Sequence, residues 1–326
     1  MLGNWEKLGA SLVLALTAVC AAPVGAQSYP NKPIRMVVPF APGGSNDVIA
    51  RIVGQKLSEA EGVSVVIDNR PGAGGVVGTD SVAKAAPDGY TLMIGATSTM
   101  AVNPGLFAKM PFDTLKDLAP ITQIAAGPFV LAVTASLPAK NVAELISLAK
   151  AKPGQLNFGS SGNGTSLHLT AELFNSMAKV SIVHVPYKGA GPALTDLISG
   201  QIHIIFSDMA ALVPYIKAGQ IRSLAVTSAK RFAVLQDLPT VQEAGVPGYV
   251  ATSWYGVLGP SGIHRDIVMK LNGDLARIVY SPEMKEKFAG LGIEPVTGTP
   301  EEFGVYIRRE IEKWSSVIKS SGAKVD

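Results

Sequence analysis

Short apolar runs alternate with helical segments along most of this sequence, and glycine-rich loops join several of them. Residues 34–38 form one such run, a loop over 42–47 follows it, and residues 48–57 have helical spacing. Runs rich in valine and isoleucine on both faces are typical of parallel strands that helices cover on either side. This alternation of strand, glycine loop and helix predicts an α/β fold.

The same alternation continues through the rest of the first half and through the middle of the chain. No flexible linker divides it, so we expect two α/β lobes joined by crossing strands. A ligand would then bind at the carboxyl ends of the strands, in the crevice between the lobes. Further strands are predicted over 63–68, 90–95, 129–134, 156–158, 182–185, 202–206 and 223–226. Further helices are predicted over 141–150, 190–199 and 209–218, and two more end near residues 86 and 177.

The C-terminal segment carries a stripe of large apolar residues at helical spacing. Its members are Phe303, Ile307, Ile311, Trp314 and Ile318, which fall at i, i+4, i+8, i+11 and i+15. This spacing places them on one face of a long helix. We expect that face to be buried against the rest of the protein.

Composition excludes several classes of protein. Hydrophobic residues make up 47% of the 326 residues, which is too apolar for a disordered chain. The 28 basic and 25 acidic residues leave a formal net charge of +3, too small over this length to predict nucleic-acid binding. The single cysteine, Cys20, excludes an intrachain disulfide framework and a cysteine-based zinc finger. The length fits two domains, each with its own core.

The only long apolar run lies near the N-terminus, over residues 8–22. It is shorter than the roughly 20 residues that a membrane-spanning helix needs. Small residues follow it up to Ala26, so we expect a secretory signal peptide over residues 1–26 and a mature, cysteine-free protein in the periplasm. A buried first helix is the alternative. The residues before Cys20 do not fit a lipoprotein signal.

Two loops have the composition of an anion-binding site. The loops over 42–47 and 159–166 each follow a predicted strand, precede a predicted helix, and are rich in glycine and small polar residues. A helix N-terminus carries about half a positive charge, so backbone N–H groups there bind anions without lysine or arginine. One such loop in each lobe would suit a small molecule with two carboxylates. Ordinary strand-to-helix turns with N-cap residues are the alternative.

Motifs for nucleotides, metals and covalent catalysis are incomplete in this sequence. The glycines over 72–78 are spaced one residue too widely for a dinucleotide-binding loop. The four histidines are scattered and form no metal-binding motif. Ser161 and His168 approach the pattern of a serine hydrolase, although His168 in the first turn of a helix fits a structural role better. Asp47 and Asp208 are interpreted as helix N-terminal residues.

A further series of motifs runs along the predicted mature chain. It comprises residues 29–35, 38–44, 69–75, 85–92, 159–169, 184–189, 216–219, 238–241 and 247–249, together with Asp47, Arg51, Trp254, Gly256, Lys313 and Trp314. In this order the motifs are similar to those of the Bug/TctC family of periplasmic solute-binding proteins, the receptors of tripartite tricarboxylate transporters. The chain resembles that family over essentially its whole mature length.

The resemblance implies a two-lobed periplasmic-binding-protein fold, similar to type II, with a ligand cleft between lobes joined by crossing strands. It implies a receptor that captures a small organic carboxylate by lobe closure and delivers it to membrane permease subunits, without catalysis, cofactor or metal. We expect a monomer that binds no nucleic acid, with lobe 1 over 27–127 and 253–326 and lobe 2 over 128–252. A sensory receptor for the same ligands and an exported serine hydrolase are the alternative functions.

The resemblance also implies which residues hold the ligand, largely through backbone amides and ordered water. The loops 40–47 and 160–166 are expected to bind its carboxylates, and residues 97, 98 and 208 to face the cleft. Asp208 departs from the family pattern, and there it would repel a third carboxylate and favour a ligand amine. The predicted ligand-binding residues are Phe40, Ala41, Pro42, Gly43, Gly44, Asn46, Asp47, Thr97, Ser98, Ser160, Ser161, Gly162, Gly164, Thr165, Ser166 and Asp208.

Overall fold

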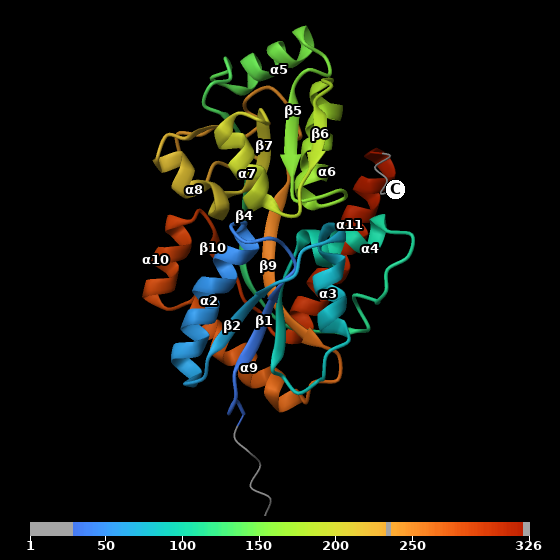
Figure 1. Cartoon of the computed structure of the whole chain (residues 1–326), viewed down its shortest axis with the longest axis vertical. Helices are drawn as coiled ribbons and strands as arrows, with labels where there is room; N and C mark the ends of the chain where they lie inside the picture. Colours follow the sequence, from blue (N-terminus) through green and yellow to red (C-terminus); the bar gives the residue numbers. More distant parts are fainter. Residues whose placement is uncertain (1–28, 233–235, 322–326) are drawn as a thin grey trace, which may run out of the picture. The chain divides into compact units, whose positions relative to one another are not determined.

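The longest strand of the fold, β4 (Leu118–Thr134), is shared by two groups of strands (Figure 1). The computed structural model describes residues 29–232 and 236–321. Up to Pro128, β4 pairs antiparallel with β9 (Thr252–Pro260), and from Phe129 it pairs antiparallel with β7 (Ile204–Asp208) and β8 (Ile221–Val226). The sheet order is β2-β1-β3-β9-β4-β7-β5-β6, and β8 and β10 also pair with β4.

The first group of strands includes three neighbouring parallel strands from the N-terminal part of the described chain. Strand β1 (Ile34–Val38) lies between β2 (Val65–Asn69) and β3 (Thr91–Ala96), parallel to both, and β3 pairs antiparallel with β9. This part of the chain also contains α2 (Ser45–Glu61), η1 (Ala73–Gly75), α3 (Val76–Ala83), the π-helical turn η2 (Ser98–Val102), α4 (Asn103–Leu106), α9 (Arg265–Val279), α10 (Pro282–Gly290), β10 (Glu294–Pro295) and α11 (Pro300–Ser321).

The second group repeats the parallel arrangement around β5 (Asn157–Ser160). This strand pairs parallel with β6 (Val183–Pro186) on one side and with β7 on the other. The helices of this group are α5 (Val142–Ala151), α6 (Ser166–Ala178), α7 (Ala190–Ser199) and α8 (Met209–Lys217). Each of α6, α7 and α8 follows a strand directly or after a short loop, so its N-terminus lies at a strand's carboxyl end.

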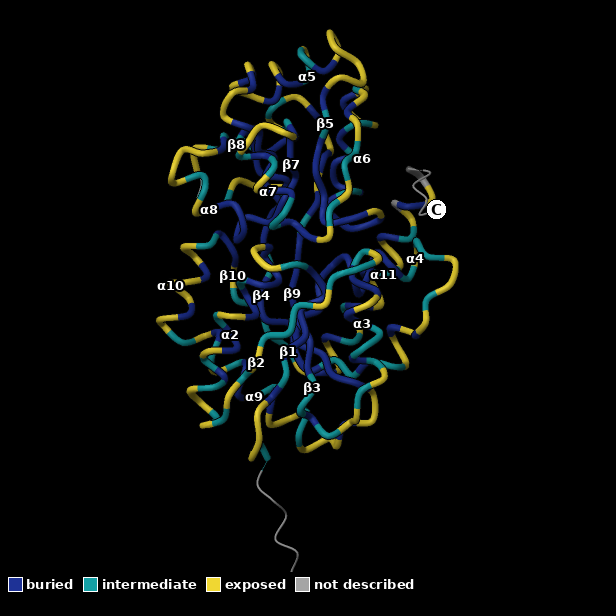
Figure 2. Tube along the Cα trace, viewed as in Figure 1, coloured by how far each residue is buried: buried dark blue, intermediate teal, exposed yellow. Residues whose placement is uncertain are grey.

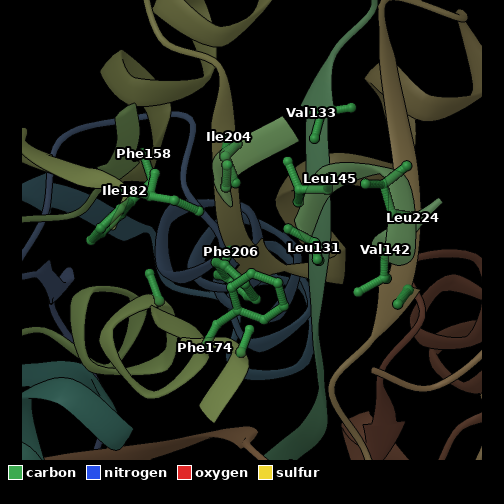
Figure 3. Close-up of a cluster of buried hydrophobic side chains, with 14 of the residues drawn as sticks. Leu131, Val133, Val142, Leu145, Phe158, Phe174, Ile182, Ile204, Phe206 and Leu224 are labelled. Atoms are coloured by element: carbon green, nitrogen blue, oxygen red, sulfur yellow. The ribbon is translucent and has the colours of Figure 1, made fainter. Parts of the chain in front are cut away.

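Strands that helices cover on both faces lose their contact with water, which is why they read as continuous apolar runs. Strands β4 and β9 are buried along most of their length (Figure 2). In the second group, Phe174 and Phe206 pack with their ring centroids 5.4 Å apart at the centre of a core that also holds side chains of α5 (Figure 3). The nearby Tyr249 is fully buried, and its hydroxyl donates to the Thr170 carbonyl oxygen over 2.7 Å.

The predictions of an α/β fold and of a buried terminal helix are confirmed. Predicted strands and helices match observed ones within a few residues; the strand predicted over 202–206, for example, begins two residues later and ends at Asp208. In α11 the stripe residues Phe303, Ile307, Trp314 and Ile318 are buried. The sequence analysis missed residues 118–128 of β4, where prolines and polar residues interrupt the apolar pattern, and it also missed β9.

Other predictions from the sequence are not tested by the structure. The predicted signal peptide and its cleavage after Ala26 lie outside the described residues. The lobe limits at 127/128 and 252/253 stay predictions, although β4 changes its pairing partner between Pro128 and Phe129. Within the described ranges, no helix is both long and apolar enough to cross a membrane.

Thr227 joins three segments of the chain close to the place where β4 and β9 pass between the two groups of strands. Its backbone N–H donates to the Phe129 carbonyl over 2.9 Å, and its carbonyl accepts from the Ala251 N–H over 2.9 Å. Its hydroxyl accepts from the Phe129 N–H over 2.9 Å and donates to the Ala251 carbonyl over 2.7 Å. Thr227 is fully buried, so no water can replace these bonds.

Replacement of Thr227 by valine should lower the free energy of unfolding by about 1–3 kcal/mol, because it leaves the buried Phe129 N–H without an acceptor. Chemical denaturation followed by circular dichroism measures this loss. Thr227→Ser is the matched control, since it keeps the hydroxyl and loses only a methyl group. A Thr227→Val protein as stable as the wild type would contradict the importance of the hydroxyl.

Candidate functional site

Two adjoining cavities lie between loops of the first and the second group of strands. The outer cavity has a volume of about 610 Å³. Its walls come from the loop after β1, the glycine loop after β2, the end of α4, and the loops after β5 and β6. The lining residues are Phe40, Gly72, Ala73, Gly74, Gly75, Phe107, Ser161, Gly162, Asn163, Pro186, Tyr187, Lys188 and Pro192.

The inner cavity is small, and seven of the twelve residues that line it are polar. Its volume of about 20 Å³ holds a group the size of a water molecule. Phe40 and Ser161 line both cavities, so the two cavities adjoin at these two residues. The lining residues are Phe40, Gly44, Ser45, Asn46, Ala96, Ser98, Ser161, Ser166, Leu167, Ala190, Asp208 and Ser253.

Four helices begin at the inner cavity. Its walls include the first residues of α2, α6 and α7, and Asp208, the N-cap residue of α8. These helices have 17, 13, 10 and 9 residues, and each carries a partial positive charge at its N-terminus. No lysine, arginine or histidine stands among the residues that line the inner cavity. Helix N-termini therefore supply the positive potential at this place.

Several buried polar atoms around the inner cavity have no hydrogen-bond partner. Among the lining residues they are Ser45 Oγ, Asn46 Nδ2 and Asp208 Oδ1. The Tyr255 hydroxyl, which lies near Asp208, Ser253 and Ser45, also makes no hydrogen bond of normal geometry. Buried polar groups in proteins are nearly always hydrogen-bonded, because an unpaired one costs about 1–3 kcal/mol. Four such atoms around one cavity favour a polar ligand group there.

The loop after β1 is held by Asp47. The Asp47 carboxylate accepts hydrogen bonds from Arg51 at 2.9 and 3.0 Å, from the Asn69 amide at 3.0 Å and from the Gly43 N–H at 3.1 Å. Burial alone would raise the pKa of Asp47, but these hydrogen bonds outweigh it and the pKa lies below its ordinary value. Asp47 is therefore ionised and shapes the loop, and it lines neither cavity.

Direct contacts join the loops of the two groups across the cavities. The Ala41 N–H donates to the Lys188 carbonyl over 3.1 Å. The Ser166 N–H donates to Ser98 Oγ over 2.9 Å, and the two hydroxyls lie 2.7 Å apart. At Gly191 a Cβ atom would come within 2.1 Å of the Pro42 carbonyl oxygen, so only glycine allows this approach.

The loop after β5 is held by two stacked imidazoles. Ser160 Oγ lies 2.6 Å from His184 Nε2, and it also accepts from the Gly162 N–H over 3.1 Å. His168 Nδ1 accepts from the Gly164 N–H over 3.0 Å. The two rings stack with their centroids 3.8 Å apart. Burial lowers the pKa of His168 to about 4, and burial together with the His168 charge lowers the pKa of His184 to about 3, so both rings are neutral at pH 7.

Asp208 lies at the carboxyl end of β7, opposite Phe129 of β4. It is 6% exposed. Burial raises its pKa, while the nearby hydroxyls of Ser253 and Tyr255 act in the opposite direction. Asp208 stands at the N-terminus of α8, as interpreted from the sequence, but its side chain makes no hydrogen bond to the helix. The reason is that its carboxyl group is turned toward the inner cavity.

The structure brings many of the predicted site residues together. Phe40, Gly44, Asn46, Ser98, Ser161, Ser166 and Asp208 line the inner cavity, and Gly162 lines the outer one. The others hold these loops in place: Thr97 Oγ1 accepts from the Trp254 N–H, and Thr165 caps α6. Eight of the predicted site residues line neither cavity, namely Ala41, Pro42, Gly43, Asp47, Thr97, Ser160, Gly164 and Thr165.

Sequence reasoning missed part of the cavity walls. Two missed stretches are the glycine loop 72–75 and the segment 186–188, each of which follows a parallel strand. Their place after a strand was the available signal, since parallel strands end at the same edge of a sheet. Ser253 and Phe107 gave no such signal, because the first lies in the missed strand β9 and the second follows the short helix α4. Within the described ranges, no three metal-binding side chains gather.

Comparison with known proteins finds relatives that match this chain over most of its length. The chain is 39% identical over 314 residues to Protein BugT of Bordetella pertussis, covering 96% of each protein. A structure from R. palustris described as Rpa4515 with adipate is 42% identical with a TM-score of 0.89, covering 91% of this chain and 100% of that one. MatC from Rhodopseudomonas palustris with bound malate is 30% identical with a TM-score of 0.84, covering 89% and 100%.

The neighbours share the two-lobed architecture of periplasmic binding proteins, which confirms the predicted fold class. Residues 49–323 match the model of the tripartite tricarboxylate transporter family receptor, TctC. This match therefore covers both groups of strands apart from β1, and it begins within α2, after the loop that follows β1. This chain belongs to the TctC family of tripartite tricarboxylate transporter receptors.

Proposed function

We propose that this chain is an extracytoplasmic solute-binding protein that captures a small organic carboxylate between its two lobes and delivers it to a membrane permease. The single observation that carries the proposal is the inner cavity, where four helix N-termini meet around unpartnered buried polar atoms. Adipate and malate, bound in two related structures, are both small dicarboxylates. We assign residues 27–127 and 253–326 to lobe 1 and residues 128–252 to lobe 2.

The charge of the cavity supports an anionic ligand group. Each helix N-terminus offers backbone N–H groups and roughly half a positive charge. A carboxylate placed there accepts hydrogen bonds from donors such as Ser45 and Asn46, which have no partner in the protein. The predicted ligand residues that line the cavities fulfil this role directly, and Asp47, Ser160 and Thr165 fulfil it by holding the loops.

Capture by closure is supported by the contacts between the two loops. Ser98 and Ser166 meet across the inner cavity, and Ala41 meets Lys188 beside the outer one. A ligand that touches both loops gains contacts only when the lobes are together, so it favours the closed arrangement. β4 and β9 join the lobes without a flexible linker, which suits a hinge at their crossing.

Delivery, location and oligomeric state complete the proposal. The family is one of transporter receptors, so integral-membrane permease subunits are the proposed partner. The apolar run over 8–22 and the small residues up to Ala26 fit export to the periplasm. The receptor is proposed to act as a monomer. A sensory receptor for the same ligands would use the same cavity and stays the alternative.

A serine hydrolase fits the site less well than a binding protein does. Ser160, whose hydroxyl does lie against an imidazole, is fully buried and also bonds to the backbone of its own loop. His168 uses Nδ1 to accept from Gly164, and its Nε2 lies 3.8 Å from Glu172. These contacts hold the loop, and they support a role of both histidines in positioning it.

A thermal-shift screen of the mature protein against small mono-, di- and tricarboxylates tests the proposed function. A true ligand at a hundredfold excess over its Kd should stabilise the folded state by about 2.7 kcal/mol, which raises the melting temperature by several degrees. Uncharged amides of the same acids should have no effect. A flat response to all carboxylates would contradict the proposal.

Paired glycine variants show whether such a response comes from this cavity. Gly162 and Gly154 both have positive φ angles, but Gly162 lines the outer cavity and a Cβ at Gly154 meets nothing within 4 Å. Valine at either position strains the backbone by about 1–3 kcal/mol. Gly162→Val should lose ligand binding at least tenfold, whereas Gly154→Val should keep it.

The histidine pair predicts a loss of stability in acid. The folded pKa values of His168 and His184, about 4 and about 3, lie below the ordinary value of 6.5. The unfolded chain therefore binds more protons between these limits, and the free energy of unfolding falls as pH drops from about 6.5 toward 4. Each histidine contributes up to about 1.4 kcal/mol per pH unit.

Chemical denaturation of the wild type and of His168→Phe between pH 7 and 4.5 measures this contribution. The variant loses the acceptor for Gly164 at every pH, but its stability should fall less steeply with acidification. Two curves that stay parallel over the whole range would contradict a neutral, buried imidazole at this position.

A further inference from the structure

Two more cavities adjoin the first turns of α11. Their volumes are about 600 Å³ and 470 Å³, and Glu301 and Val305 line both of them. Strand β4 contributes to the wall of each, and β9 contributes to the smaller one. None of their lining residues lines a cavity of the candidate site. The first group of strands is therefore hollowed at a place that the binding of a small carboxylate does not explain. We refer to the walls of these two cavities as the α11 surface.

Two large apolar side chains of the α11 surface are exposed. Leu115 is 41% exposed and Val305 is 49% exposed, and both line the smaller cavity. Single exposed apolar side chains are common on proteins, but a hollowed surface that carries more than one marks a site for another molecule. Because Val305 also lines the larger cavity, the two hollows form one continuous surface.

Two neighbouring arginines of the α11 surface have no acceptor. Arg308 lines the smaller cavity and Arg309 the larger one, and both are exposed. Neither makes a hydrogen bond or an ion pair with a residue of 29–232 or 236–321. Every other arginine in the sequence is held by a carboxylate or by backbone carbonyl groups. Arginine presents a planar fork of N–H donors that fits a carboxylate, so this pair can bind carboxylates of another molecule.

A buried amide in the larger cavity is also without a partner. Gln123 of β4 lines this cavity, is 8% exposed, and makes no side-chain hydrogen bond within the described ranges. Polar side chains buried to this extent are nearly always hydrogen-bonded. The Gln123 amide can both donate and accept, so a polar group that enters the cavity would satisfy it.

The acidic side chains of the α11 surface are already engaged. Glu301 accepts from Arg265 over 2.9 Å, and Glu302 accepts from the Thr299 N–H over 2.8 Å. The charges left for a partner are therefore positive, with two carboxylates close by. A uniformly anionic membrane surface would be repelled by these carboxylates and would gain only about 1 kcal/mol from each arginine. A protein segment can place its carboxylates at the arginines and its apolar side chains in the two hollows.

The buried side of α11 is hydrogen-bonded toward the ligand cavity. Glu310, which follows Arg309, accepts from Trp254 Nε1 over 3.2 Å. The Trp254 N–H donates to Thr97 Oγ1 over 3.2 Å, and Thr97 precedes Ser98, which lines the inner cavity. The strands β4 and β9, which join the two lobes, also contribute to the α11 surface. A partner that binds here therefore contacts the elements that connect the lobes, as suits a partner that receives the ligand.

We propose that the α11 surface docks the membrane permease, through a segment of the permease that carries apolar side chains and carboxylates. The apolar side chains enter the two hollows beside Leu115 and Val305, and the carboxylates pair with Arg308 and Arg309. A second copy of this chain fits less well, because a symmetric contact would bring its own arginines to the same place. This inference rests on the proposed function and names the surface by which the receptor reaches its partner.

Photo-crosslinking in living cells tests the α11 surface with the full receptor. p-Benzoylphenylalanine in place of Val305 reacts with the molecule that covers this position, in cells that make both the receptor and its permease. The matched control position is Val66, a 53% exposed valine of β2 that lines none of the four cavities. We expect mass spectrometry to find position 305 joined to a permease subunit close to aspartate or glutamate residues, and to find no such product from position 66.

Charge reversal of the two arginines should remove this product. Arg308→Glu together with Arg309→Glu should lower its yield by about tenfold or more, because the carboxylates of the permease would then meet like charges. Lys150→Glu together with Lys152→Glu reverses two exposed lysines at the end of α5 and should leave the yield unchanged. Denaturation curves show whether each protein is folded, and Leu115 is the second crosslinking position if the first proves unstable.

The possible results separate the docking surface from ligand binding. No permease product from position 305, an equal product from position 66, or a product that survives the arginine reversal would overturn the docking surface. Products with lipid alone or with a second copy of the receptor would also overturn it, the first indicating a membrane surface and the second a dimer. A protein that a carboxylate stabilises but that gives no permease product keeps its proposed ligand and loses only this surface, whereas a flat carboxylate screen overturns the proposed function itself.

Discussion

The arrangement of this protein depends on one strand that takes part in two groups of strands. Because β4 continues from its pairing with β9 into its pairing with β7 and β8, the two groups are fixed by backbone hydrogen bonds and not by a flexible linker. Thr227 adds a buried set of hydrogen bonds at the same crossing. The carboxyl ends of the parallel strands on either side therefore meet at one place, and the loops that follow them form the cavity walls.

The chemistry of that place follows from backbone geometry more than from charged side chains. Helices that start after β1, β5, β6 and β7 all begin at the inner cavity. Their N-termini supply positive potential, and small or polar residues leave their N–H groups accessible. Such a place would suit an anion even though the net charge of the chain is only +3. It also makes the one buried carboxylate, Asp208, the exceptional feature of the wall.

The fold could be predicted from the sequence wherever the buried residues of an element recur at regular spacing. The runs at 34–38 and 129–134 and the stripe that ends at Ile318 are examples, since each has one consistent spacing. The first part of β4 could not be predicted, because Pro120, Gly127 and Pro128 interrupt it and its stability comes from its pairing with β9. Local pattern contains no information about such distant pairing.

The candidate site, like the fold, could be predicted from the sequence only in part. The loops 40–47 and 160–166 could be placed from their glycines and their position after strands, and the structure brings them together. The roles of the individual residues in these two loops could not be predicted from the sequence. Whether Asp47 faces the cavity or holds Arg51, and whether Ser160 meets His184, depends on side chains that lie 4 to 24 residues away in sequence. Ligand binding by the loops 40–47 and 160–166 is a proposal that follows from this geometry.

The central claim is that a small carboxylate draws the two lobes together, and a distance measured across the outer cavity tests it most directly. The sequence after residue 26 contains no cysteine, so cysteines introduced at Lys109 and Thr195 can carry a pair of spin labels. These exposed positions follow Phe107 and Pro192, which line the cavity from the two lobes. The account predicts a shorter, narrower distance distribution when a carboxylate that stabilises the protein is added. A distribution that is unchanged at saturating ligand would contradict it.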